Sequence, residues 1–302
     1  MRRRAVVVHR PTEYDELMDR YSTRGQVEFV LRSRGRSLES VERAHEAHMS
    51  ALARVRAGIP REWASADVER DSLSRFLFAP EDVIVVVGPD GLVANTAKYV
   101  ADQVVIGVDS APGSNAGVLV RCTPDQGAAV CRRLDEGEPV GVDHLTMVRA
   151  TVDDSRSLTA LNEVFLGHRS HQSARYELVL PGRAERQSSS GVVVSTGTGA
   201  TGWGASLKRG RPLGELPAPT SPSLAWFVRE AWPSPSTGTE CTEGILGEGE
   251  ELGLSVASES LVLFGDGMEA DRLVLTWGQT VRVCRAPRAL ALVDPTAHEG
   301  GV

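Results

Sequence analysis

Glycine alternates with hydroxyl residues in one short stretch, Ser195-Thr196-Gly197-Thr198-Gly199. Three valines at residues 192–194 come just before it and predict a short buried strand. From Thr201 onwards the chain can begin a helix. A turn with little side-chain bulk and many free N–H groups lets a polar ligand approach the main chain. A flexible loop is the alternative, but the flanking strand and helix favour a binding turn.

A second candidate site follows the most apolar strand of the chain. Residues 83–87 are five consecutive Val or Ile residues, typical of a parallel strand covered on both faces. This strand ends at Gly88-Pro89-Asp90-Gly91, and residues 92–108 predict a helix and a second strand. In such units ligands bind at the carboxyl ends of the strands, where Asp90 and Asp109 fall. Alone, Gly-Pro-Asp-Gly is also an ordinary type I turn.

Asn162 and Glu163 interrupt an otherwise apolar run at residues 158–166. Neighbours in a strand point to opposite faces, so at most one of the two would face the core. A glutamate near a buried strand needs a partner such as a ribose hydroxyl or an arginine. The competing interpretation is a polar pair on an edge strand, which by itself is the more common case.

Two histidines lie one helical turn apart, at His45 and His48. Their helix is predicted to begin after Ser37, a good N-cap, and to end at Gly58 and Pro60. The pair could in principle hold a metal, but the sequence offers no third ligand nearby. We therefore interpret both as partly buried histidines on an apolar helix stripe.

Composition limits the class of protein. The 302 residues, 41% of them hydrophobic, are enough for two domains with cores of their own. A formal charge of −7 argues against a general nucleic-acid binder. No apolar run reaches the roughly 18 residues of a membrane span. The four cysteines form no CxxC pair and no disulfide-like array. We expect a cytoplasmic protein without membrane or nucleic-acid partners.

The order of predicted elements gives the fold class. Strands and helices alternate up to a helix at residues 123–136, whereas short strands with turn signals follow, apart from a proline-rich loop at residues 209–223. We predict a Rossmann-like α/β domain followed by a β-rich, β-sandwich-like domain. The expected boundaries are residues 1–125 for the α/β domain, 126–285 for the β-rich domain, and 286–302 for a last strand returning to the first domain, with a tail. The strand-like segments expected in the second half are 144–152, 158–166, 175–180, 191–195, 224–229, 252–257, 261–264, 273–276, 280–284 and 290–293.

Three motifs occur together in an order that resembles the NAD kinase family. They are Ala160-Leu161-Asn162-Glu163-Val164-Phe165, Ser189-Ser190-Gly191 and the Ser195–Gly199 turn. The mitochondrial-type branch is the most similar, because it also has a Ser-Ser-Gly entry and Thr-Gly-Thr-Gly where other members have Asp-Gly and Thr-Pro-Thr-Gly. Further counterparts in the same order are Arg32-Ser33-Arg34-Gly35, the His45/His48 helix, residues 83–90, Ile106-Gly107-Val108-Asp109 and Phe264-Gly265-Asp266-Gly267.

This resemblance implies a function and a set of residues. The family transfers the γ-phosphate of ATP, in some members a phosphate of polyphosphate, to the 2′-hydroxyl of the adenosine ribose of NAD, with a divalent metal that we expect to be Mg²⁺. Asp90 matches the general base, which would take the proton of the attacking hydroxyl. Trp203 could stack on an adenine. The substrate- and nucleotide-binding residues implied are Gly88, Gly91, Asn162, Glu163, Thr198, Gly199, Thr201, Gly202, Trp203 and Ser206. No metal-ligating side chain is implied. The family also suggests a homodimer with its active site between the domains.

One motif departs from the family. Its Gly-Gly-Asp-Gly-Thr sequence appears here as Gly88-Pro89-Asp90-Gly91-Leu92. Proline removes a backbone N–H and leucine removes a hydroxyl where phosphates should bind. Three hypotheses therefore remain: an ATP-dependent NAD kinase, a related kinase with another acceptor, and a non-catalytic sensor that binds NAD(P) without turnover.

Overall fold

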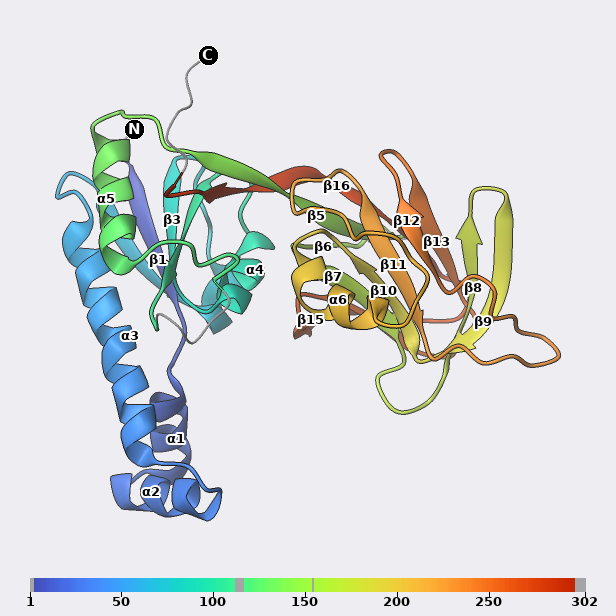
Figure 1. Cartoon of the computed structure of the whole chain (residues 1–302), viewed down its shortest axis with the longest axis horizontal. Helices are drawn as coiled ribbons and strands as arrows, with labels where there is room; N and C mark the ends of the chain where they lie inside the picture. Colours follow the sequence, from blue (N-terminus) through green and yellow to red (C-terminus); the bar gives the residue numbers. More distant parts are fainter. Residues whose placement is uncertain (1–2, 112–116, 154, 297–302) are drawn as a thin grey trace. The chain divides into compact units, whose positions relative to one another are not determined.

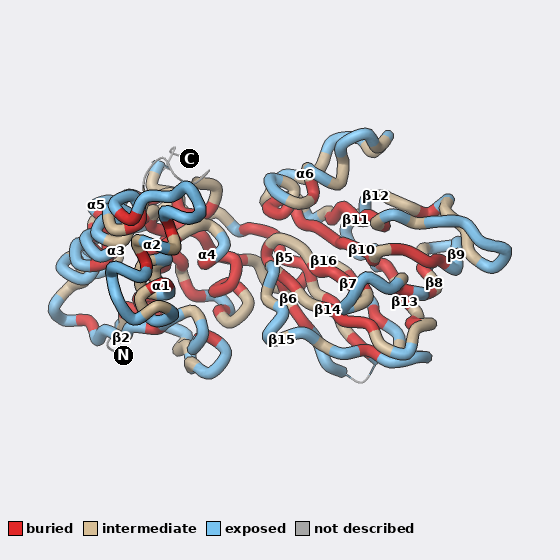
Figure 2. The backbone as a smooth tube through the Cα atoms, turned by 90° about the horizontal axis from the view of Figure 1, so that it is seen from below, coloured by how far each residue is buried: buried red, intermediate tan, exposed pale blue. Residues whose placement is uncertain are grey.

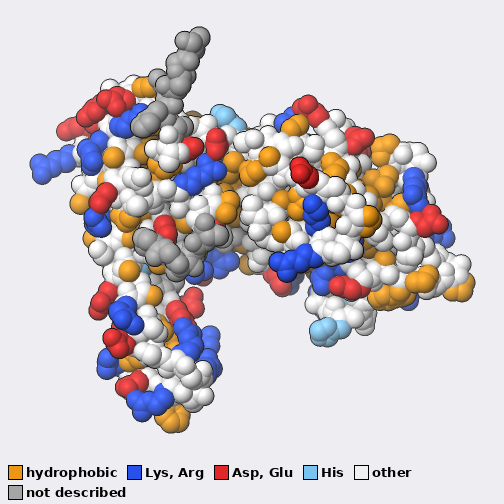
Figure 3. Space-filling view, viewed as in Figure 1, with side chains coloured by type: hydrophobic (Ala, Val, Ile, Leu, Met, Phe, Trp, Pro, Cys, Tyr) orange, Lys and Arg blue, Asp and Glu red, His pale blue; other side chains and the backbone are white. Residues whose placement is uncertain are grey.

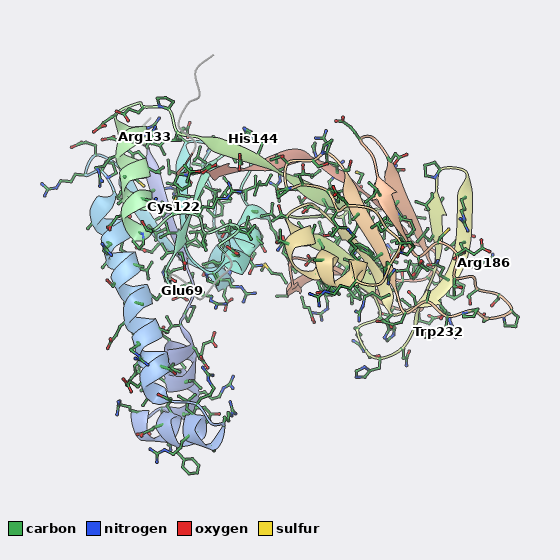
Figure 4. All side chains as sticks on the ribbon, in the orientation of Figure 1. Glu69, Cys122, Arg133, His144, Arg186 and Trp232 are labelled. Carbon is green, nitrogen blue, oxygen red and sulfur yellow. The ribbon has the colours of Figure 1, made fainter. Side chains whose placement is uncertain are left out.

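The computed structural model describes residues 3–111, 117–153 and 155–296. The chain divides into two compact units: unit 1 contains Met1–Asp143 and Ala291–Val302, and unit 2 contains His144–Leu290. Among the described residues, no helix combines the length and apolar character needed to cross a bilayer. The four cysteines are free, and Cys122 lies in the interior of unit 1 (Figure 4).

Unit 1 is an α/β layer structure (Figure 1). Its strands follow the order β2-β1-β3-β4-β16, and every pair is parallel. Its elements are β1 (Arg4–His9), α1 (Glu13–Tyr21), α2 (Arg24–Ser33), α3 (Leu38–Gly58), β2 (Ala64–Glu69), η1 (Arg70–Arg75), β3 (Asp82–Gly88), α4 (Asp90–Ala97), β4 (Val104–Asp109), α5 (Pro124–Asp135) and the end of β16 (Thr280–Val293).

The central strand β3 is buried along its whole length, as its unbroken Val/Ile run predicts. Val83, Val85 and Val87 pack in one cluster with residues of α3 and α5. Ile84 and Val86 point to the opposite face, where α4 packs against β3. The sheet is therefore covered on both faces, and its carboxyl-terminal edge is left for polar groups.

Helix α3 begins at the N-cap that the sequence predicts. The Ser37 hydroxyl accepts a hydrogen bond from the Ser40 N–H and starts α3. Thr12 and Asp15 form a reciprocal capping box at the start of α1. Beyond the sheet, α1, α2 and the first turns of α3 enclose a small apolar cluster of their own. The surface of this helical part mixes acidic and basic side chains (Figure 3).

Unit 2 is a sandwich of two antiparallel sheets around one apolar core. One sheet has the order β12-β11-β10-β7-β14-β15, and the other contains the first part of β16 with β13, β8 and β9, beside β5 and β6. Figure 2 shows the buried positions in red along the middle of these strands. The strands are β5 (Val142–Val152), β6 (Ser157–Ala160), β7 (Glu163–Gly167), β8 (Ala174–Leu180), β9 (Arg183–Ser189), β10 (Gly191–Ser195), β11 (Leu224–Arg229), β12 (Glu243–Leu246), β13 (Glu251–Val256), β14 (Leu261–Gly265) and β15 (Met268–Leu275). Between β10 and β11 lie η2 (Gly199–Thr201) and α6 (Trp203–Lys208).

The fold class predicted from the sequence is confirmed, but some elements differ. The apolar run at residues 158–166 is not one strand, because it bends between β6 and β7 at Leu161 and Asn162. The opposite-face argument for Asn162 and Glu163 therefore fails, since only Glu163 lies in a strand. Strands β2, β9 and β12 were not predicted, because their sequences are polar or lack clear alternation.

The boundaries of the two structural units also differ from the predicted domain boundaries. Helix α5 packs against α3 and belongs to unit 1, whereas residues 126–135 had been placed in the β-rich domain. Near the C-terminus, Ala291 and Leu292 pair with β4 in unit 1. The last part of the predicted tail, residues 297–302, lies outside the described residues.

Candidate functional site

The polar edge of unit 1 lies at the carboxyl ends of its parallel strands. Gly88 ends β3 and is in register with Asp109, which ends β4. Asp90 is the first residue of α4, two positions after β3, and Gly91 is exposed beside it. The structure thus places Gly88, Asp90 and Gly91 where the sequence predicts a phosphate turn.

The Asp90 carboxylate is held by three consecutive backbone N–H groups. Its Oδ2 accepts from Val118 at 3.1 Å, and its Oδ1 accepts from Leu119 and Val120, each at 2.9 Å. Hydrogen bonds to an ionised acceptor are stronger than neutral ones. Asp90 therefore fixes the segment that follows β4, and a hydroxyl giving its proton to Asp90 would have to share these lone pairs.

A cavity of about 200 Å³ lies at the same edge of unit 1. It is lined by the segments that follow β1, β3 and β4, among them Arg10, Pro89 and Ser110, and by α3. His48 of α3 lines it with only 7% of its surface exposed, and its Nε2 has no hydrogen-bond partner within the described chain. Burial lowers the pKa of His48 to about 4, so the ring is neutral at physiological pH.

The metal interpretation of His45 and His48 gains no support. The His45 Nδ1 shares a hydrogen bond of 2.8 Å with the Thr12 hydroxyl. Within residues 3–111, 117–153 and 155–296, no three His, Cys, Asp or Glu side chains gather in a group that could hold a metal ion.

In unit 2 the chain bends at Leu161 and Asn162, and the N–H and C=O groups of both residues are hydrogen-bonded. Asp266 accepts the N–H of Leu161 at 2.8 Å and that of Asn162 at 2.7 Å. Thr196 binds the two carbonyls: its hydroxyl donates to Leu161 O at 2.6 Å and its N–H donates to Asn162 O at 2.9 Å. A bend with every backbone group satisfied presents Asn162 and Glu163 in a fixed geometry.

The same threonine joins this bend to the Gly/Thr turn. The Thr196 hydroxyl accepts the N–H groups of Thr198 at 3.1 Å and Gly199 at 3.2 Å. A Cβ on Gly199 would lie 2.3 Å from Asn162 O, and one on Gly197 would lie 2.0 Å from Ala218 O. We expected these glycines to leave space for a ligand, but protein carbonyls fill that space. Gly197 and Gly199 are therefore required for packing between segments of unit 2.

Two polar groups at this corner lack a protein partner. The Thr198 hydroxyl oxygen is buried and has no hydrogen bond to any described residue. Glu163 is half-buried, and its carboxyl group likewise forms no hydrogen bond within the described part of the chain. Burial, and secondly the charge of Asp266, raise the pKa of Glu163 to about 7. Buried polar groups without partners indicate a site that a polar ligand would complete.

Aromatic rings border the start of α6. Trp203, its first residue, lies with its ring centroid 5.9 Å from that of Phe165 of β7. The Arg229 guanidinium lies 5.5 Å from the Trp203 ring centroid, a cation–π distance. Phe264 of β14 is 5.1 Å from Phe165 and extends the cluster. An aromatic face held in this way can stack on a base or a nicotinamide.

The remaining predicted residues lie around the same helix start. Thr201, Gly202 and Ser206 are exposed, and the Thr201 hydroxyl donates to Thr198 O at 2.8 Å. Unit 2 therefore brings together Asn162, Glu163, Thr198, Gly199, Thr201, Gly202, Trp203 and Ser206, while Gly88, Asp90 and Gly91 lie in unit 1.

The sequence analysis assigns no role to four contributors to unit 2: Phe165, Thr196, Arg229 and Asp266. Phe165, Thr196 and Asp266 stand in motifs quoted above, whereas Arg229 stands in none of them. Their contacts join segments distant in sequence, such as β7, β11 and α6, which no local pattern reveals.

Comparison with known proteins identifies the fold. No family model matches the sequence. No curated protein matches it either. Among solved structures, the chain is similar to yeast NADH kinase in complex with NADH, with a TM-score of 0.64 and 13% sequence identity over 98% of this chain and 84% of that one. At that identity the likeness shows a shared fold: this chain has the two-domain fold of yeast NADH kinase.

Proposed function

We propose that this protein is an NAD(H) kinase, which transfers the γ-phosphate of ATP to the 2′-hydroxyl of the adenosine ribose of NAD or NADH. The observation that carries the proposal is the corner at Asn162 and Glu163. Its backbone is fully bound, yet the buried Thr198 hydroxyl and the half-buried Glu163 carboxyl group beside it form no hydrogen bond to any described residue. The fold shared with yeast NADH kinase supports the choice of dinucleotide.

In the proposed reaction each residue has a defined task. Glu163 and Asn162 hold hydroxyl or amide groups of the dinucleotide, and Trp203 supplies an aromatic face. Asp90 accepts the proton of the ribose hydroxyl as that oxygen attacks the γ-phosphorus and ADP leaves. A divalent ion bound to ATP would neutralise the phosphate charge.

Leu92 does not exclude a donor from the edge of unit 1. Its side chain is 2% exposed and therefore buried within unit 1. Compared with the family motif, Leu92 supplies no hydroxyl and Pro89 supplies no backbone N–H. Because the Leu92 side chain is buried, it adds no apolar surface to the edge of the sheet. We therefore keep ATP as the proposed donor, with polyphosphate as the alternative.

One observation favours binding without turnover as a second function. The Asp90 carboxylate already accepts three N–H groups, so it can act as a structural anchor without serving as a base. A sensor of this kind would bind NAD(H) or NADP(H) and release no phosphorylated product. A related kinase with another acceptor is the third possibility, and neither Asp90 nor Leu92 favours it.

A coupled assay separates these functions. The purified protein is incubated with Mg²⁺, ATP and either NAD or NADH, and NADP(H) is detected with an NADP-specific dehydrogenase, while calorimetry measures binding. Product that requires ATP supports the kinase. Binding of NADH without product supports the sensor, and absence of both contradicts dinucleotide function. Light scattering on the same sample tests the expected homodimer.

A further inference from the structure

Asp266 lies in a tight turn that faces the Asn162–Glu163 corner. The turn joins β14 to β15, and its two central residues, Asp266 and Gly267, have φ values of 53° and 66°. This left-handed geometry is the hairpin turn for which Asp-Gly is a preferred pair. The backbone position of Asp266 is therefore set by the hairpin itself.

From this position Asp266 contacts three consecutive residues. Its carboxylate binds the N–H groups of Leu161 and Asn162, and its own N–H donates to Glu163 O at 3.1 Å. Thr196 binds the carbonyls of Leu161 and Asn162 from another segment. Removing Asp266 would leave two backbone N–H groups of the corner without their acceptor.

The charge of Asp266 also acts on Glu163. Burial is the larger reason why the Glu163 pKa rises to about 7, and the nearby negative charge of Asp266 adds to it. Among the described residues, Asp266 is the charged group that adds to this shift. Its own carboxylate accepts two backbone N–H groups, which favour its charged form. The negative charge held there disfavours the ionised form of Glu163.

We propose that Asp266 is a positioning residue for dinucleotide binding: it fixes the backbone of the corner that presents Asn162 and Glu163, and its charge acts on the Glu163 carboxyl group. A neutral carboxylic acid donates one hydrogen bond and still accepts others, whereas a carboxylate only accepts. The hydroxyl groups of a ribose both donate and accept, so the neutral acid matches them. This inference rests on the proposed function for the identity of the ligand, but the state of Glu163 can be measured without any ligand.

Two substitutions remove the charge of Asp266 and spare the turn. Asp266→Asn keeps one acceptor oxygen and Asp266→Gly keeps none, and both asparagine and glycine tolerate a positive φ. Glu185→Gln is the matched control. The Glu185 carboxylate also accepts two consecutive N–H groups, those of Glu240 and Cys241, each at 3.2 Å. However, Glu185 lies in β9 and does not contact the Asn162–Glu163 corner through these bonds. Glu163→Gln assigns the Glu163 signal.

The readouts are the carboxyl ¹³C shift of Glu163 against pH, in protein labelled at glutamate, and the affinity for NADH by calorimetry. We expect Glu163 to titrate near pH 7 in the parent chain and clearly lower in both Asp266 variants. We expect NADH affinity to fall about tenfold in Asp266→Asn, the equivalent of one lost hydrogen bond, and further in Asp266→Gly. Glu185→Gln should change neither quantity.

Two results would overturn the inference: an unchanged Glu163 titration in both Asp266 variants, or the same two effects in Glu185→Gln. A shifted titration in a protein that binds no NADH has a different meaning. It supports the action of Asp266 on Glu163 and contradicts the proposed dinucleotide function.

Discussion

Replacing Asp90 by Asn should destabilise the fold as well as reduce activity. Three backbone N–H groups donate to the carboxylate at 2.9 to 3.1 Å, and a hydrogen bond to a charged group contributes about 1.5–3 kcal/mol. The Asn amide keeps one acceptor oxygen, but its NH₂ group would face an N–H donor. The loss of at least one charged hydrogen bond predicts a decrease of about 2–4 kcal/mol in the free energy of unfolding.

Urea denaturation of the parent chain and the variant measures this decrease. Asp135→Asn is the matched control, because Asp135 also lies in unit 1 and its carboxylate accepts a single hydrogen bond among the described residues, from the Trp63 Nε1–H at 2.8 Å. Its decrease should be clearly smaller. Equal stability of Asp90→Asn and the parent chain, within about 0.5 kcal/mol, would refute the anchoring role.

This result also decides how the activity of the variant is interpreted. If Asp90 is both anchor and base, Asp90→Asn should lose at least about a hundredfold in kcat and still bind NADH under conditions where it is folded. If kcat instead falls only in proportion to the unfolded fraction, Asp90 takes no part in the chemical step and serves only as a structural anchor.

Three other substitutions test the corner in unit 2. Thr196→Val should lower the free energy of unfolding in urea by about 2–4 kcal/mol, because it leaves Leu161 O and two N–H groups without their partner; a change below about 0.5 kcal/mol contradicts this. Gly199→Ala should weaken NADH binding in calorimetry, since its Cβ would lie 2.3 Å from Asn162 O; unchanged affinity means that the corner can shift freely. Glu163→Gln should remove part of the pH dependence of thermal unfolding. In the parent chain the Glu163 pKa rises from 4.5 to about 7 on folding, so its contribution is present below 4.5 and is lost as the pH rises through 7. Identical pH profiles would contradict the buried neutral acid.

The sequence predicts the α/β half of the molecule well for physical reasons. The Val/Ile run of β3 is typical of a strand buried between two helical layers, and the cap at Ser37 marks the start of α3 with little ambiguity. Position at the end of β3 also identifies Asp90 as a candidate. The three N–H groups that bind it come from residues 118–120, and no local pattern pairs them with Asp90.

The binding corner is harder to predict because its bonds join distant segments. The apolar run at residues 158–166 looks like one strand, and only Asp266 and Thr196 explain why it bends at Leu161 and Asn162. Asp266 lies 105 positions and Thr196 35 positions beyond Leu161 in the chain. Similarly, the glycines of the Gly/Thr turn predict space for a ligand beside the main chain, whereas the structure places the carbonyls of Asn162 and Ala218 in that space.

A labelled donor tests directly whether this protein moves a phosphoryl group from ATP to the 2′-hydroxyl of a dinucleotide. The protein is incubated with Mg²⁺, NAD or NADH, and ATP labelled with ¹⁸O in its γ-phosphate, and the product is identified by mass spectrometry. We expect a labelled phosphate on the adenosine ribose, and none when the 2′-hydroxyl of the acceptor is replaced by hydrogen. Unmodified dinucleotide after incubation, with NADH binding intact by calorimetry, would contradict the kinase and leave a binding protein in its place.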